Sequence, residues 1–375
     1  MRIGIAFDLK PDCPLPAGAP DDLHEEFDSP VTVRAIADVF RSLGHEPVEL
    51  GDGRPFLEAV LRDPPDLVFN FAEGSGVSRS REARVPAVCE MLGIPYTGSD
   101  PLALAASLDK EITRRLAAAA GVTVPKGITL SFPDGPSPGL WEGGSFREGE
   151  APAEPRANGS AGASPSRKPW TYDGDFAEFP PILEEAGLPL PVIAKPVCEG
   201  SSKGVRSKSL IRTAAEFGPT VLQLWKDYRQ PVLVEEFIAG DEVTVGITGN
   251  DPPQPLGIMR VIPKQPTEHF IYSLEVKRDW DNTVSYDAPA KLPPEVTQAV
   301  LADALTVFAA LGCRDVARAD FRIRDGVPYF LEINPLPGLN PESGDLCYLA
   351  YRLGLTHPDL IELILDAALA RYGLG

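Results

Sequence analysis

Along the first hundred positions of the chain, segments whose apolar residues follow a strand pattern alternate with segments whose apolar residues follow a helix pattern. Short runs rich in Val, Ile and Phe predict strands at residues 2–7 and 66–71. Apolar residues three to four positions apart predict amphipathic helices at 31–45 and 81–94, the first of them ending near Gly44. Strands that alternate with helices predict a parallel α/β sheet in this part of the chain.

The rest of the chain is expected to mix helices with antiparallel strands. A strong helical pattern at 107–121 ends at Gly121, and a final helix is expected at 360–372. Residues 316–333 predict a hairpin that turns at Asp325-Gly326. Further strands are expected at 126–130, 190–196, 231–237, 240–248 and 255–262, and further helices at 176–187, 213–225 and 292–312. The expected fold class is therefore α/β at the N-terminus and α+β beyond it.

Residues 133–169 interrupt these patterns. The stretch is dense in Pro, Gly, Ser and Ala and has no apolar periodicity, so it cannot bury a core. We expect a disordered insertion at a surface turn with no role in the chemistry. A segment that binds a partner is the alternative.

Length, charge and cysteine usage narrow the class of protein. A chain of 375 residues is too long for one core, and we expect units at 1–101, 102–237 and 238–375. The formal net charge of −19 argues against nucleic acid or an anionic membrane as a partner. No apolar run approaches the roughly 20 residues that span a bilayer, and the start does not resemble a signal peptide. Five Cys without a CxxC pairing and four scattered His favour reduced thiols, a cytoplasmic location and no zinc site.

A candidate metal site lies in the string YFLEINPLPGLNPESG at 329–344. Glu332 and Asn334 are two positions apart in a strand pattern, so their side chains point to the same side. The antiparallel hairpin brings Asp320 near them, in a register that the sequence leaves open, and Arg318 shares the parity of Asp320. Three oxygen ligands suit Mg²⁺ or Mn²⁺. The alternative is a set of structural ion pairs on a solvated face.

Two lysines and a loop suggest phosphate binding. Lys195 ends an apolar strand, and the following EGSSKG contains Gly200 and Gly204, which allow a tight loop whose N–H groups and Ser hydroxyls cradle phosphate. Lys110 lies in the first turn of its helix, where the dipole disfavours a cation unless an anion is present. The chain contains neither GxxxxGK[ST] nor a GxGxxG between a strand and a helix.

Four strings resemble the ATP-grasp superfamily and, within it, the D-alanine–D-alanine ligase family. They are LGIPYTGSDPLALAASLDK, VIAKPVCEGSSKGV, VLVEEFIAGDEVTV, and RADF followed by YFLEINPLPGLNPESG. The resemblance covers nearly the whole chain except 133–169. It implies an N-terminal parallel α/β domain followed by a two-subdomain ATP-grasp fold, with ATP between two sheets. The implied activity is ATP-dependent joining of two D-alanine molecules through an acyl phosphate, as in peptidoglycan synthesis for the cell wall.

The same resemblance assigns roles to individual residues. The expected phosphate-binding residues are Lys110, Lys195, Lys277 and the loop residues Glu199, Gly200, Ser201 and Ser202. Adenine and ribose are expected at Glu235, Glu236, Ile238 and Glu242. Two Mg²⁺ ions are expected at Asp320, Glu332 and Asn334. The oxyanion and the two amino-acid substrates are expected at Arg318, Gly338, Glu25, Ser343 and Arg278, and the catalytic set is Arg318, Gly338, Glu25 and Ser202.

The first-substrate region departs from the family pattern. Glu73 stands where the family has His, Arg79 and Arg81 follow it, and Arg278 replaces a Tyr. One interpretation is a first substrate that is larger than alanine or carries an extra acidic group, because Arg grips carboxylates with two hydrogen bonds. The other is that Glu73 and Glu82 pair with these arginines.

Three functions therefore stay open at the level of the sequence. The first is a D-alanine–D-alanine ligase type of enzyme, and the second is a related ligase for a different amino acid or small acid. The third is a nucleotide-binding protein without catalysis. Small-molecule amino acids are the expected partners, and a homodimer is what the family suggests.

Overall fold

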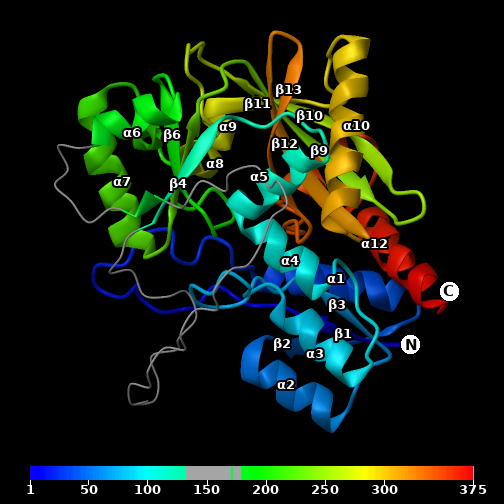
Figure 1. The fold of residues 1–375 in the computed structure, drawn as a ribbon. Coiled ribbons are helices and arrows are strands. Elements are labelled where there is room, and N and C mark those ends of the chain that lie inside the picture. The colour runs from blue at the N-terminus through cyan, green and yellow to red at the C-terminus, as the bar shows by residue number, and fades with distance from the viewer. Residues whose placement is uncertain (132–169, 172–178, 375) are drawn as a thin grey trace, which may run out of the picture.

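The N-terminal unit is a small parallel sheet covered by helices. The computed structural model describes residues 1–131, 170–171 and 179–374, so the insertion predicted at 133–169 lies outside the described residues. The parallel sheet has the order β2-β1-β3, formed by β2 (Glu46–Gly51), β1 (Arg2–Ala6) and β3 (Leu67–Asn70). Helices α1 (Pro30–Ser42), α2 (Gly53–Arg62) and α3 (Arg84–Leu92) accompany it (Figure 1). The predicted parallel α/β unit is confirmed, although the patterns missed β2 and α2.

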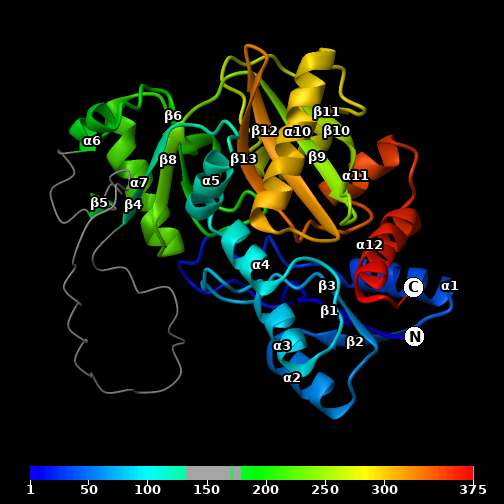
Figure 2. The same ribbon diagram turned by 45° about the vertical axis from the view of Figure 1, so that its right-hand side comes forward.

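The apolar spacing of α1 explains its position in this unit. Val33, Ile36, Ala37 and Phe40 recur three to four residues apart and are all buried. Pro30 begins the helix, where its missing N–H costs no hydrogen bond. The buried face of α1 packs on the sheet and against α12 (His357–Tyr372), and the two helices lie side by side (Figures 1 and 2).

A second sheet follows in the central part of the chain. Its order is β5-β4-β8-β6-β7, and the strands are β4 (Gly127–Ser131), β5 (Trp170–Thr171), β6 (Val192–Pro196), β7 (Leu210–Ile211) and β8 (Val232–Glu236). β8 is antiparallel to both β4 and β6. Helices α6 (Phe179–Ala186) and α7 (Ala214–Tyr228) pack together on this sheet, which has its own core.

The third sheet is antiparallel throughout, with the order β11-β10-β9-β12-β13. The predicted hairpin is confirmed as β12 (Val316–Arg324) and β13 (Val327–Asn334). Asp325 and Gly326 both have left-handed backbones, with φ of 53° and 78°, as a two-residue hairpin turn requires. The remaining elements are β9 (Asp241–Thr248), β10 (Gln254–Pro263), α8 (Leu274–Arg278), α9 (Trp280–Thr283), β11 (Val284–Asp287) and α11 (Asp345–Arg352).

Helix α10 (Pro294–Leu311) covers one face of the third sheet. Its 18 residues have a mean hydropathy of 1.2, which is long and apolar enough, by composition, to cross a membrane. Val296, Val300, Ala304, Val307 and Phe308 lie on one face of the helix and are buried against the sheet. Packing on the sheet therefore accounts for the apolar residues of this face.

The helix predicted at 107–121 is wrong in one respect, because two helices occupy this region. Helix α4 (Pro101–Leu108) ends before Asp109, and α5 (Lys110–Ala119) begins after it. The Asp109 carboxylate accepts a hydrogen bond from the N–H of Ile112 and caps α5. The break places Lys110 at the first position of α5, directly beside the second sheet, where its N–H donates to the carbonyl of Val197.

Candidate active site

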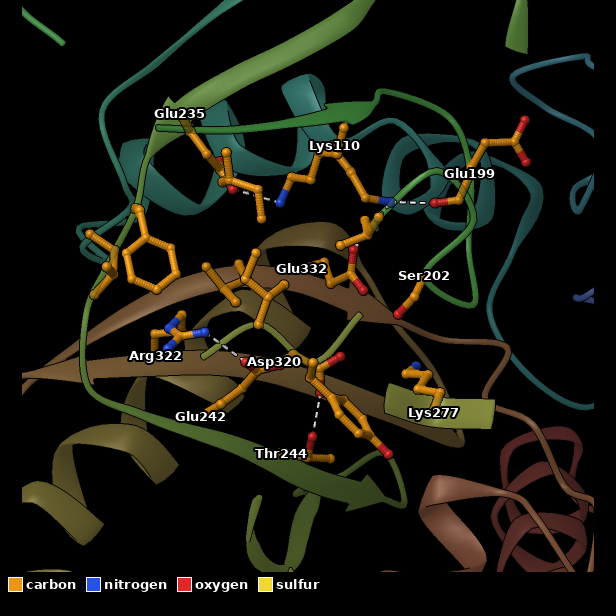
Figure 3. Close-up of a pocket in the computed structure, with 18 of the residues that line it drawn as sticks. Lys110, Glu199, Ser202, Glu235, Glu242, Thr244, Lys277, Asp320, Arg322 and Glu332 are labelled. Carbon is orange, nitrogen blue, oxygen red and sulfur yellow. Dashed lines mark hydrogen bonds and ion pairs between the residues drawn. The ribbon is translucent and has the colours of Figure 1, made fainter. Parts of the chain in front are cut away.

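The second and third sheets face each other across a cavity of about 870 Å³, its open mouth included (Figure 3). Strands β6 and β8 line one side with Lys195, Glu235 and Glu236, and the segment after β8 adds Phe237 and Ile238. The other side is lined by residues of β9, β12 and β13, namely Glu242, Thr244, Arg318, Asp320, Arg322, Leu331 and Glu332. Nine of the eleven predicted nucleotide residues line this cavity, namely Lys110, Lys195, Glu199, Ser202, Glu235, Glu236, Ile238, Glu242 and Lys277, whereas Gly200 and Ser201 line a smaller cavity beside it.

The β12–β13 register brings the predicted metal ligands together. Asp320 lies directly opposite Glu332, and Arg318 lies directly opposite Asn334. Residues directly opposite in an antiparallel pair point to the same face, so all four side chains share one side of the hairpin. The proximity predicted from the sequence is confirmed, and the register that the sequence left open is settled.

The two phosphate lysines are held by carboxylates inside the cavity. The Lys110 ammonium lies 3.1 Å from the Glu332 carboxylate and also donates to the backbone carbonyl of Glu199, and Lys195 lies 2.6 Å from Glu235. Burial alone would raise the pKa of Glu332, but Lys110, Lys195 and Arg318 lower it to about 2. Glu332 is therefore a carboxylate at neutral pH. The Glu199 carboxylate points away from the other labelled side chains (Figure 3), and it accepts hydrogen bonds from Lys203 and Gln230.

A line of polar contacts continues along the third sheet. Arg318 contacts Asp320 and Asp345, both at 3.0 Å, and Lys277 lies 3.5 Å from the same Asp345 carboxylate. Deeper in the cavity, Arg322 donates to Glu242 at 2.8 Å, while burial raises the pKa of Glu242 against this opposing charge. These ion pairs hold the side chains of Arg318 and Lys277 where they line the cavity.

The loop at 199–205 is tightly wound and fastened at two points. Ser201 and Ser202 have left-handed backbones with φ of 47° and 59°, a conformation that costs non-glycine residues roughly 1–3 kcal/mol each. The N–H of Gly200 donates to Glu26, and the N–H of Gly204 donates to Asp22. Both acceptors belong to the N-terminal unit, so this loop joins the N-terminal unit to the second sheet.

A second cavity of about 800 Å³ adjoins the first and shares Tyr272, Lys277, Arg318 and Asp345 with it. The predicted substrate residues Glu25, Arg278, Gly338 and Ser343 line it, together with Ser201 and Asn334. Its wall also contains Trp280, Tyr286 and Tyr348, whose rings contact one another. The structure therefore brings all the predicted substrate residues to one place beside the hairpin.

The three arginines of the first-substrate region are already paired with carboxylates. Arg278 contacts Glu25 and Asp21, both at 2.7 Å, and the buried Arg81 contacts Glu26 at 2.8 Å. Arg79 contacts Asp109 at 2.6 Å and lines a different groove. The expectation that Glu73 and Glu82 are the bonding partners of these arginines is wrong.

Several residues at the site were missed by the sequence patterns. Asp345, which orients Arg318 and Lys277, begins α11, a helix that was not expected. Glu26 and Asp22 accept hydrogen bonds from a loop that lies 174 and 182 positions away, and no local pattern marks them. Arg322 lies two positions after Asp320 and four after Arg318 in the same strand, so the alternation of strand residues predicts that all three side chains point to one face.

The donor set of the hairpin fits a hard divalent cation. Asp320 and Glu332 supply carboxylate oxygens, and Asn334 supplies an amide oxygen, which also accepts the N–H of Leu336. These are the ligand types that Mg²⁺ prefers, with water and substrate oxygens filling the remaining positions. Among the residues that the structure describes, no group of three or more His, Cys, Asp or Glu forms a metal-binding cluster, so substrate oxygens would have to complete the shell.

Comparisons with known proteins agree with this geometry. The family model described as D-ala D-ala ligase C-terminus matches residues 178–366. The D-alanine–D-alanine ligase of Gluconobacter oxydans is 30% identical over 346 residues, covering 91% of this chain and 94% of the relative. That of Moorella thermoacetica is 28% identical, covering 89% and 92%.

Solved structures share the fold. The D-alanine–D-alanine ligase from Bacillus anthracis, complexed with ATP, has a TM-score of 0.65 at 20% identity, with both chains covered completely. The VanG D-Ala:D-Ser ligase from Enterococcus faecalis has a TM-score of 0.64 at 20% identity, with 98% of this chain and 99% of that chain covered. Sequence relatives and fold together show that this chain belongs to the D-alanine–D-alanine ligase family of ATP-grasp proteins.

Proposed function

We propose that this chain is an ATP-dependent carboxylate–amine ligase of the D-alanine–D-alanine ligase type. It converts ATP and two D-alanine molecules into the dipeptide, ADP and phosphate. The observation that carries the proposal is the hairpin face with Arg318, Asp320, Glu332 and Asn334, which borders a cavity that is also lined by Lys110, Lys195 and Lys277. Relatives that match nearly the whole chain are named for this activity.

The first cavity suits ATP bound between the sheets. Lys110 and Lys195 hold the α- and β-phosphates and Lys277 reaches the γ-phosphate, each exchanging its carboxylate contact for a phosphate oxygen. Glu235 and the backbone of Glu236 and Ile238 recognise adenine. The loop residues Glu199, Gly200, Ser201 and Ser202 cover the triphosphate, and Glu242 binds the ribose hydroxyls.

The metal ligands have a separate task. Asp320, Glu332 and Asn334 would hold Mg²⁺, or Mn²⁺, when the nucleotide is bound. A divalent cation here neutralises the charge of the phosphoryl group during transfer. The low pKa of Glu332, which Lys110, Lys195 and Arg318 depress against burial, keeps this ligand in its anionic form at neutral pH.

Two steps then join the substrates. An oxygen of the first substrate's carboxylate attacks the γ-phosphorus of ATP, the bond to ADP breaks, and an acyl phosphate results. The amine of the second substrate attacks the acyl carbon, and the tetrahedral oxyanion is stabilised by Arg318 and the N–H of Gly338. Collapse breaks the bond to phosphate, which leaves with the proton that the amine nitrogen loses, and the amide remains. Closure of the loop that contains Ser202 excludes water from the acyl phosphate.

The substrates lie in the second cavity. Ser343 binds the carboxylate of the second amino acid, and Glu25 and Arg278 lie where the first amino acid enters. We extend the proposal to a cytoplasmic enzyme of peptidoglycan synthesis, to units at 1–101, 102–237 and 238–375, and to a homodimer, as the family suggests.

A ligase for a different amino acid or small acid is the second candidate. It is favoured by the ion pair between Glu25 and Arg278 at 2.7 Å. The family resemblance assigns the ammonium of the first substrate to the Glu25 carboxylate, and here Arg278 already binds that carboxylate. A protein without catalysis is disfavoured, since the cavities contain every lysine, arginine and carboxylate that the chemistry requires.

The test is a screen of amino-acid pairs with Mg²⁺ and ATP, in which ADP, phosphate and the product mass are measured together. We expect ADP formation that depends on an amino acid, with a dipeptide as product. ATP turnover that ignores amino acids, or no turnover with any pair, would contradict the proposal.

A further inference from the structure

A third, smaller cavity lies beside the hairpin, and its lining includes two glutamates of the N-terminal unit. It has a volume of about 400 Å³ and shares Lys110, Glu199, Arg318 and Glu332 with the first cavity. Asn334 and Ser201 connect it to the second cavity. These glutamates are Glu73 and Glu82. A small acid in this cavity would therefore have its reacting group beside Arg318.

Glu73 and Glu82 differ from the other charged residues of this cavity because nothing neutralises them by direct contact. Lys110 pairs with Glu332, Arg318 pairs with Asp320, and Glu199 pairs with Lys203. In the described part of the chain, no hydrogen bond or ion pair reaches the carboxylate of Glu73 or Glu82. The Glu82 residue is only 6% exposed, and its side chain lines the cavity. A buried carboxylate without a partner is costly, and a cation supplied by a ligand removes that cost.

The backbone that carries Glu73 is fixed in place. The Asp8 carboxylate accepts the N–H groups of Glu73 at 3.0 Å and Gly74 at 2.7 Å. Gly74 has a φ of 79°, and a Cβ added there would lie 2.5 Å from the carbonyl oxygen of Arg81. Only glycine allows this close approach of the two segments. The two carboxylates therefore converge on a rigid scaffold rather than on a loose loop.

We propose that Glu73 and Glu82 bind the ammonium of the first substrate, an amino acid whose carboxylate is at the same time placed near Arg318 and Asn334. This inference rests on the proposed ligase function. It reverses the expectation of an acidic substrate, because the arginines are paired internally and the two groups left over are carboxyls that no cation contacts. It also assigns to Glu73 and Glu82 the task expected of Glu25, which Arg278 already holds at 2.7 Å.

The substrate preference follows from this charge. A primary ammonium donates hydrogen bonds to both carboxylates, whereas a hydroxyl in its place brings no charge. An extra carboxylate on the substrate would meet two like charges. D-Alanine is therefore preferred over D-lactate, which differs from it only at this group, and over D-glutamate.

The experiment uses the full chain and the variants Glu73→Gln and Glu82→Gln, which keep the side-chain shape. The matched control is Glu58→Gln, an exposed carboxylate on α2 paired with Arg54. kcat/KM for phosphate release is measured with D-alanine, D-lactate or D-glutamate as first substrate. We expect each site variant to lose about 10- to 100-fold in kcat/KM for D-alanine, through KM, the range typical of one charged hydrogen bond. D-Lactate should change little, and the control should match the wild type.

Binding measured by calorimetry, with a non-hydrolysable ATP analogue present, separates the two proposals. If no first substrate is turned over, the ligase function fails, yet D-alanine should still bind more tightly to wild type than to Glu82→Gln. Equal D-alanine affinity in wild type and both variants, or equal affinity of wild type for D-alanine and D-lactate, overturns the inference. Melting temperatures should not fall, since neither carboxylate makes a bond that the variants lose.

Discussion

Replacing Glu26 with Gln should both destabilise the protein and raise its KM for ATP. Glu26 is 3% exposed in its side chain and contacts Arg81 at 2.8 Å, Lys203 at 3.1 Å and the N–H of Gly200 at 2.5 Å. The variant keeps the shape and some hydrogen bonds but removes the charge. Arg81 and Lys203 would then share one remaining carboxylate, that of Glu199.

The size of the effect can be estimated in two ways. Burial would raise the pKa of Glu26, but Arg81, Lys203 and the Gly200 N–H lower it from 4.5 to about 2. This lowering corresponds to about 3 kcal/mol of stability at neutral pH. Breaking a buried ion pair by removing one partner costs roughly 3–5 kcal/mol, which agrees.

The pH dependence gives this prediction its sign. Because the folded pKa lies below the unfolded value of 4.5, the contribution is complete above that pH and is lost as the pH falls toward 2. The stability difference between wild type and Glu26→Gln should be about 3 kcal/mol at pH 7 and roughly 1.4 kcal/mol at pH 3.

Urea unfolding at both pH values measures this difference, and Glu58→Gln is the control, with an expected cost under about 0.5 kcal/mol for an exposed pair. Because Glu26 also fastens the loop at 199–205, the KM for ATP should rise several-fold in Glu26→Gln. A variant with wild-type stability and an unchanged KM for ATP would refute the argument. A loss of stability that does not depend on pH would show that the charge is not its cause.

Three further predictions follow from the site and from the composition of the chain. Glu332→Gln or Asp320→Asn should abolish nearly all ligase activity, measured as product formation, while circular dichroism shows an intact fold, because a metal ligand loses its charge. Replacing residues 134–168 with a short Gly/Ser linker should leave melting temperature and turnover nearly unchanged, since loop closure costs only about 0.6 kcal/mol per doubling of length. Burial raises the pKa of Glu82 from 4.5 to about 8, so wild type loses stability as the pH rises between these two values. In thermal melts, Glu82→Gln should therefore be more stable than wild type at pH 8 but not at pH 4.

The sequence predicted the site best where its geometry follows from local periodicity. Strand parity placed Arg318, Asp320, Glu332 and Asn334 on one face, and the Asp325-Gly326 turn made the two strands neighbours. The register could not be read from the pattern, because a bulge after Asp320 shifts the pairing by one residue. The alternation of residues along each strand determines which face a side chain points to. The turn and the bulge determine which residues of the two strands lie opposite each other.

Local pattern failed where a charge is satisfied by a residue far away in the chain. Asp109 ends one helix and caps the next, although the residues around it have good helix propensity, because its side chain offers the backbone an alternative bond. Arg81 meets Glu26 across 55 positions and Arg278 meets Glu25 across 253. These pairings decide whether an arginine is available to a substrate, and only the folded chain reveals them.

The pairings also explain how a chain of net charge −19 can bind a polyanion. Lys110 lies against Glu332, and Arg318 lies against Asp320, so these two cations of the site are held in position by the two carboxylates proposed to bind the metal. In the proposed complex, binding of phosphate by Lys110 would weaken its pairing with Glu332 and leave that carboxylate free for a divalent cation. The same exchange at Arg318 would free Asp320 and leave the guanidinium for the developing oxyanion. Nucleotide and metal should therefore bind cooperatively. Both require the Lys110–Glu332 and Arg318–Asp320 pairs to open, and the cations that are released bind the nucleotide while the carboxylates that are released bind the metal.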